Sequence, residues 1–134
     1  MANEMRVRVH NDLLITAEDE SNALILSGNE KAMTPMKALL ASLGGCTGID
    51  VLMILQKMRE KVKEVNVYID YERAKDYPKI YTKIHIKYVV VGDVREESVK
   101  RAIKLSEEKY CSISAMLSKS TEITRSYEII GDIE

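Results

Sequence analysis

The sequence predicts an α+β fold in which a sheet packs on a long central helix. Three observations lead to this prediction: short alternating segments at the N-terminus, one long apolar segment opened by Thr34-Pro35, and a strand-rich segment followed by amphipathic helix patterns. The expected order of elements is βββ-α-ββ-αα-β. Because the chain has 134 residues and contains no repeat or linker, we expect residues 1–134 to form a single domain.

The N-terminal segment has the pattern of a small antiparallel meander. Met5, Val7 and Val9 alternate with Arg6, Arg8 and His10. Polar turns separate this segment from two further apolar runs, at residues 13–16 and 23–26. Such alternation is typical of strands with one buried face, so three strands joined by hairpins are expected here.

The central helix is expected over residues 34–59. Thr34 is a good N-cap, and Pro35 suits the first helical position. Asp50 is the only charged residue between positions 38 and 55, so a membrane span has to be weighed. Three glycines and the acid argue against a span. Since residues 51–55 are apolar on every side and a small chain has few elements to cover them, we expect a second copy of the chain to help, giving a homodimer.

The second half of the chain predicts the remaining strands and helices. Strands are expected at residues 65–71 and 80–91. An amphipathic helix follows Gly92-Asp93, and its apolar stripe is expected to include Tyr110. A break near Cys111 then leads to the last two elements, a short helix over residues 113–119 and a strand over residues 123–130.

The composition excludes several classes of protein. With 46% hydrophobic residues the chain is too apolar for intrinsic disorder, and 20 Lys+Arg against 21 Asp+Glu leaves no broad basic surface for nucleic acid. The first residues lack the apolar stretch of a secretory signal, so a reducing cytoplasm and no membrane attachment are expected. His10 and His85 have no further ligand at metal-binding spacing, so no metal site is expected.

Cys46 lies between paired glycines and Thr47, and Thr47 and Asp50 have the spacing of a capping box. If a new helix begins there, Cys46 lies at its N-terminus, where free backbone amides lower a thiol pKa. The alternative is that Gly44, Gly45 and Gly48 allow close packing of the helix and that Cys46 is a small buried hydrophobe. The spacing alone leaves both interpretations open.

Cys111 is the second of the two cysteines and lies at the junction of two helical segments. Ser112 is a candidate cap of the short helix, which would place this thiol beside free amides as well. A thiolate that attacks a peroxide and a second thiol that condenses with the resulting sulfenic acid form a peroxide-reducing pair. Two unrelated buried cysteines are the alternative.

Taken together, Thr34-Pro35-Met36, the segment Leu43-Gly44-Gly45-Cys46-Thr47 and the later Cys111-Ser112-Ile113-Ser114 resemble the OsmC-like family of osmotically inducible and organic-hydroperoxide-resistance proteins. The resemblance covers nearly the whole chain. It implies an intertwined homodimer with the long helix at its centre, thiol peroxidase activity on small organic hydroperoxides or binding of an apolar ligand, and reduction by a dithiol partner. Cys46 is similar to the peroxidatic thiol of the family and Cys111 to the resolving one.

The chain departs from the best-characterised peroxidases of this family at two positions. Met36 stands where they carry a glutamate, and Ser112 replaces a proline. Those enzymes also hold the thiolate with an arginine from the N-terminal part, for which Arg6 and Arg8 are available here. The resemblance therefore implies a less characterised branch. A protein that binds an apolar or reactive sulfur ligand at the dimer interface is the alternative function.

Overall fold

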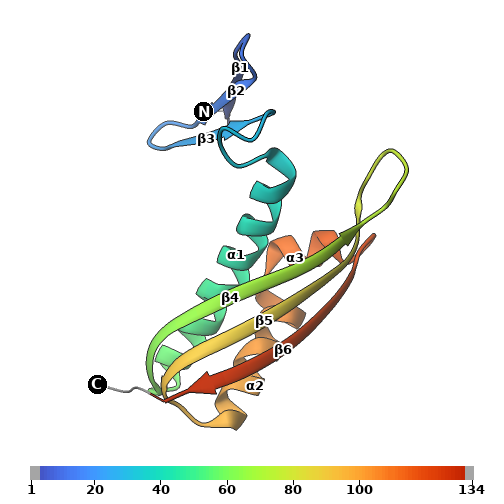
Figure 1. Ribbon diagram of the computed structural model, residues 1–134. Coiled ribbons are helices and arrows are strands. Elements are labelled where there is room, and N and C mark those ends of the chain that lie inside the picture. Colours follow the sequence, from blue (N-terminus) through green and yellow to red (C-terminus); the bar gives the residue numbers. More distant parts are fainter. Residues whose placement is uncertain (1–3, 132–134) are drawn as a thin grey trace. The chain divides into compact units, whose positions relative to one another are not determined.

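The computed structural model describes residues 4–131. Within these residues the chain divides into two compact units, the first ending at Ala41 and the second beginning at Ser42 (Figure 1). The expected α+β order of elements is confirmed, with two three-stranded sheets and a long helix between them in the sequence.

The first unit contains the predicted meander. Strands β1 (Arg6–Val9), β2 (Leu14–Glu18) and β3 (Ala23–Ser27) pair antiparallel in sequential order. Alternation did predict these strands, but it did not predict their burial, since several of their apolar side chains are more than half exposed: Val7 57%, Val9 67%, Leu24 54% and Ile25 57%.

Helix α1 (Pro35–Lys57) begins in the first unit and continues into the second. As predicted, Thr34 caps it: the backbone N–H of Lys37 donates to Thr34 Oγ1 at 3.4 Å. The helix is continuous through Cys46 and Thr47. Of the two interpretations that the spacing left open, a new helix beginning at Thr47 is therefore excluded, because the glycines before it remain in helical conformation.

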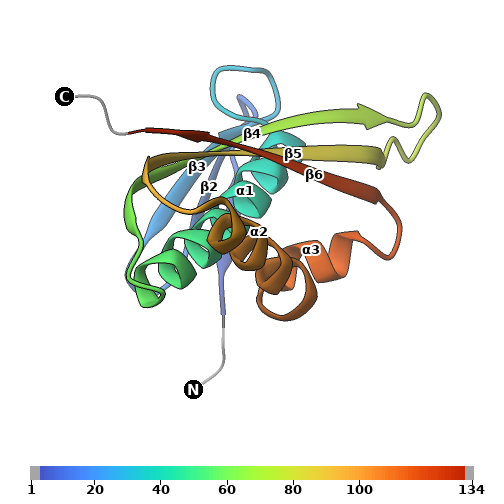
Figure 2. The same cartoon turned by 90° about the horizontal axis from the view of Figure 1, so that it is seen from below.

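The second unit is a three-stranded sheet with helices on one of its faces (Figure 2). Strands β4 (Lys61–Arg73) and β5 (Tyr81–Asp93) are antiparallel, whereas β5 and β6 (Glu122–Ile130) are parallel. A parallel pair requires a crossover connection. That connection consists of α2 (Glu96–Leu105), a π-helical segment η1 (Ser106–Tyr110) and α3 (Ser112–Leu117).

The core of this unit lies between the sheet and the helices. It is formed by side chains that are almost fully buried: Leu43, Val51 and Leu55 of α1, Ile84, Ile86, Tyr88 and Val90 of β5, and Val99 and Ala102 of α2. Two glycines bring α1 close to β4. A Cβ at Gly44 would lie 3.1 Å from Ile69 Cδ1, and one at Gly48 would lie 3.2 Å from Val67 Cγ2. The close-packing interpretation is thus confirmed for Gly44 and Gly48, but a Cβ at Gly45 would meet nothing within 4 Å.

The π-helical segment changes the direction of the side chains that follow α2. A π turn inserts an extra residue, which rotates later residues away from the stripe that the α-helical period predicts. Tyr110, expected on that stripe, is 49% exposed. The expectation for Tyr110 was therefore wrong, and the irregularity lies directly before Cys111.

Helix α1 is long and apolar enough to cross a membrane by length and composition. Those criteria do not separate a membrane span from the core helix of a globular unit. Within the second unit, Val51 and Leu55 of this helix are fully buried, while Ile49 and Met53 remain 59% and 50% exposed. The helix thus has a packed side and an apolar side that is open in the single chain.

Replacement of Gly92 tests the close approach of β5 to β4. Gly92 has a φ of +141°, and a Cβ there would clash with the carbonyl oxygen of Lys61. We expect Gly92→Ala to lower the free energy of unfolding by about 2–3 kcal/mol, measured by urea denaturation. Gly131→Ala is the matched control, since a Cβ there meets no atom within 4 Å. Equal stability of the two variants would contradict the prediction.

Candidate functional site: a pair of thiols at the start of α3

The two cysteines meet in the second unit. Cys46 lies in the middle of α1 and is partly exposed, whereas Cys111 directly precedes α3 and is only 3% exposed. The two side chains are near enough for Cys111 to raise the pKa of Cys46. Both are free thiols. A disulfide between them requires the two sulfurs to approach to about 2.0 Å.

Both sulfurs also lie against the first turn of α3. The backbone N–H of Ile113 donates to the Cys46 sulfur, and the backbone N–H of Ser114 donates to Cys111 Sγ at 3.4 Å. Cys111 is itself the N-cap of α3, where Ser112 was the expected cap. Cys46, expected at the start of its own helix, instead receives its amide donor from a different helix, which only the tertiary fold brings to it.

The surroundings of Cys46 favour the neutral thiol. Burial raises its pKa, and the neighbouring Cys111 and the Asp50 carboxylate raise the pKa further, while the Ile113 N–H lowers it. The net effect is a pKa above the usual value. The interpretation in which a helix start lowers the pKa of Cys46 is thus excluded, because burial and the neighbouring negative charge outweigh the single amide.

A chain of buried hydroxyl groups passes beside the two thiols. Thr47, which is fully buried, places Oγ1 2.7 Å from the Tyr88 hydroxyl and 2.8 Å from Ser106 Oγ. Ser106 Oγ donates to Asp50 Oδ2 at 2.9 Å. In addition, the backbone N–H of Cys111 donates to the Ser106 carbonyl oxygen at 2.8 Å. These bonds connect α1, β5 and η1 at the level of the cysteines.

Arg125 of β6 stands at the other end of this chain. Its side chain is 10% exposed, its guanidinium bonds to the Tyr88 hydroxyl, and Nη1 lies 3.3 Å from a Glu107 carboxylate oxygen. Its Nε is buried and has no hydrogen-bond partner among the described residues. Burial raises the pKa of Tyr88, and the bonds from Thr47 and the Arg125 charge oppose that rise.

Arg125 and Ser106 were not singled out in the sequence. The sequence could have indicated Arg125, because it alternates with exposed residues of β6 and lies between Ile123 and Tyr127 on the less exposed face of the strand. The N-terminal candidates are placed differently: Arg6 lies 3.9 Å from Glu18 on the neighbouring strand and is 65% exposed, and Arg8 is exposed as well.

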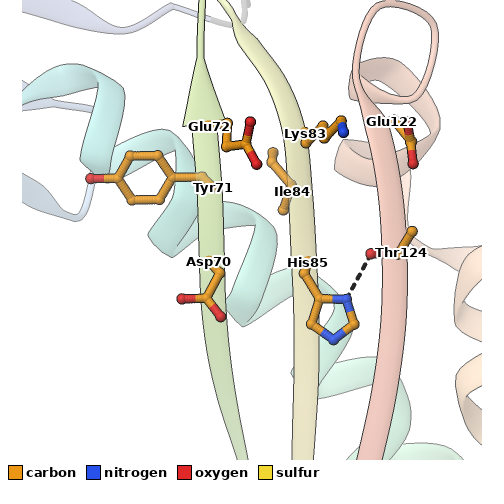
Figure 3. A pocket seen from close by; sticks show the side chains of 8 residues that line it. All are labelled: Asp70, Tyr71, Glu72, Lys83, Ile84, His85, Glu122 and Thr124. Atoms are coloured by element: carbon orange, nitrogen blue, oxygen red, sulfur yellow. Dashed lines mark hydrogen bonds between the residues drawn. The ribbon is translucent and has the colours of Figure 1, made fainter.

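The histidines lie outside the thiol site. His85 is on the face of the sheet opposite the helices, in a shallow pocket of about 180 Å³ with Asp70 and Lys83 (Figure 3). Its ring nitrogens lie 2.6 Å from Thr124 Oγ1 and 2.8 Å from Ser126 Oγ. His10 lies 3.3 Å from Thr16 Oγ1 in the first unit. In the part of the chain that the structure describes, no three His, Cys, Asp or Glu side chains are grouped to hold a metal ion.

The chain is thus a dithiol protein, in which an α+β unit brings a thiol of the long helix α1 near a thiol within the crossover connection. The family model described as "OsmC-like protein" matches residues 28–126. The chain belongs to the OsmC-like family.

Known proteins resemble the chain over nearly its full length. Protein YhfA of Escherichia coli strain K12 is 39% identical over 132 residues, which cover 96% of this chain and 98% of that protein. A hypothetical protein from Aquifex aeolicus VF5 has a crystal structure that superposes with a TM-score of 0.90 at 36% identity, covering 99% of each chain. An organic hydroperoxide resistance protein OsmC from Legionella pneumophila shares the fold, with a TM-score of 0.72 at 11% identity and coverage of 96% and 97%.

Removal of the Cys111 sulfur tests the contact between the thiols. Cys111 raises the pKa of Cys46 both as a hydrogen-bond partner and as a like charge. In Cys111→Ala the pKa of Cys46 is therefore expected to fall. A larger fraction of Cys46 is then thiolate at any given pH. The midpoint of the pH profile for alkylation of Cys46 by iodoacetamide should shift to lower pH. Ser118→Ala, at an exposed position after α3, should leave the midpoint unchanged.

Replacement of Thr47 tests the buried hydroxyl chain. Thr47→Val keeps the shape of the side chain but removes the acceptor of the Tyr88 hydroxyl proton and the partner of Ser106. Because a buried polar group without a partner costs about 1–3 kcal/mol, we expect the free energy of unfolding to fall by about 2 kcal/mol. Thr82→Val, at an exposed position of β5, should change it by less than about 0.5 kcal/mol in the same urea titration.

Proposed function

We propose that the protein is a thiol-dependent peroxidase that reduces organic hydroperoxides through Cys46 and Cys111. One observation carries the proposal: two free thiols from distant parts of the chain lie near each other at the first turn of α3, where Cys111 raises the pKa of Cys46. Cys46 is the more exposed of the two and is assigned the attack on the peroxide. Cys111, buried beside it, is assigned the resolving role.

The reaction has two steps in this proposal. Cys46 sulfur attacks the terminal oxygen of the hydroperoxide, the O–O bond breaks, and a sulfenic acid and an alcohol result. Cys111 sulfur then attacks the sulfenic sulfur, which forms the disulfide and releases water. The amide N–H groups of Ile113 and Ser114 donate to the two sulfurs and hold them beside each other. A dithiol reductant restores both thiols, and no metal or organic cofactor takes part.

We further propose that the protein acts as a cytoplasmic homodimer. The exposed apolar side chains support a second copy of the chain, because Ile49 and Met53 on α1 are more than 45% exposed, as are Val7 and Val9 on β1. Single chains rarely leave so many large apolar groups in water. The substrate is assigned as a small organic hydroperoxide, by analogy with the Legionella pneumophila protein named for resistance to such compounds.

A second function is favoured by the state of Cys46. Its raised pKa leaves little thiolate at neutral pH, whereas peroxide-reducing thiols are usually ionised. In this alternative the protein binds an apolar or reactive sulfur ligand and does not turn over peroxide.

Intact mass measurement separates the two functions. Treatment of the reduced protein with one equivalent of cumene hydroperoxide should remove two hydrogen atoms, as an intramolecular disulfide forms. Cys111→Ser should instead gain one oxygen at Cys46, and Cys46→Ser should lose the fast reaction. Ser118→Ala is the control and should behave as the unmodified chain. No oxidation of either cysteine, together with saturable binding of a hydrophobic ligand or a polysulfide, would favour the alternative.

A further inference from the structure

The buried hydroxyl chain has a fixed direction. The Asp50 carboxylate can only accept a hydrogen bond, so the directions are fixed from that end and the Tyr88 proton points to Thr47. The Thr47 proton must then point to Ser106, and Ser106 donates to Asp50. Three hydroxyl protons are thus aligned from a buried cation to a carboxylate.

Asp50 is the end of this chain, and its position relates it to Cys46. The two residues are four apart on α1, so their side chains lie on the same face of the helix. Ser106 engages Oδ2, which leaves Oδ1 without a hydrogen bond to a described residue. Asp50 is half-buried, as is Cys46.

We propose that Asp50 carries the proton of the peroxidase reaction, taking it from the Cys46 thiol and giving it to the departing alkoxide. This inference rests on the proposed function and adds to it a residue for proton transfer. The need for such a group follows from the site: Cys46 is a thiol rather than a thiolate, and no arginine or lysine acts on its sulfur among the described residues. A carboxylate on the same helix face is within reach directly or through one water.

The step balances in protons and electrons. The S–H bond of Cys46 breaks as its proton moves to Oδ1 of Asp50, and the sulfur lone pair forms an S–O bond with the terminal peroxide oxygen. The O–O bond breaks with both electrons on the alkoxide, which takes the proton back from Asp50 and leaves as the alcohol. The sulfur is oxidised by two electrons, the peroxide is reduced by two, and Asp50 ends as the carboxylate that Ser106 holds.

Asp50→Asn gives a test in which two reagents should respond in opposite directions. Asparagine cannot accept the thiol proton, so the rate constant for oxidation of Cys46 by cumene hydroperoxide should fall by about 10²-fold. Iodoacetamide needs only thiolate, because iodide leaves without a proton. Since the Asp50 charge raises the pKa of Cys46, its removal should leave alkylation unchanged or make it faster. Asp50→Glu should recover part of the peroxide rate.

The controls separate proton transfer from charge and from folding. Asp70→Asn, on the opposite face of the sheet, should change neither rate. Ser106→Ala removes the bond that fixes Oδ2 and should slow the peroxide reaction less than Asp50→Asn does, again without slowing alkylation. If circular dichroism shows that Asp50→Asn does not fold, Ser106→Ala replaces it as the test: the peroxide rate should fall while the alkylation rate does not.

Four results would overturn the inference. If Asp50→Asn lost both rates in parallel, Asp50 would be a structural residue. If both rates rose in parallel, or if the peroxide rate stayed unchanged, Asp50 would be only a negative charge near the thiol. In these three cases the unmodified protein still reduces hydroperoxide and the proposed function stands. A failure of the unmodified protein to consume hydroperoxide would overturn the proposed function and this inference with it.

Discussion

The hydroxyl of Thr47 is the polar contact on which the geometry of the site depends. It is fully buried, and it accepts from Tyr88 while it bonds Ser106, so one oxygen atom joins the central helix, the middle strand and the crossover. A buried polar group must be satisfied, and each of these three hydroxyls satisfies another. Because the cost of breaking such a network is high, α1 and η1 are held in one register relative to each other.

That register places the two cysteines. Cys46 directly precedes Thr47 in α1, and the Cys111 amide is bonded to the Ser106 carbonyl oxygen. When the hydroxyl network fixes Thr47 and Ser106, the two sulfurs are therefore brought to the same point, the first turn of α3. The π-helical segment contributes as well, since its extra residue ends at Tyr110 and sets the direction in which the chain enters Cys111.

In some thiol sites a cation beside the sulfur stabilises the thiolate. The charges of this site are arranged differently. The Arg125 side chain is largely buried, but its guanidinium acts on Tyr88 and Glu107 and is not among the groups that shift the pKa of Cys46. Asp50, in contrast, acts on Cys46 from the same helix. This distribution keeps Cys46 protonated. A protein of this kind needs a group that moves a proton, whereas an enzyme with a preformed thiolate needs one that stabilises an anion.

The sequence alone determined the order of elements, the cap at Thr34 and the identity of the two thiols, because alternation, capping chemistry and cysteine count are local properties. It led to the wrong state for Cys46, since Thr47 and Asp50 have the spacing of a helix start but are used in contacts with residues 41 and 56 positions away. Only the tertiary structure decided that both sulfurs meet at α3 and that Arg125 faces inward. Those outcomes depend on burial and on the pairing of distant polar groups, which no local pattern encodes.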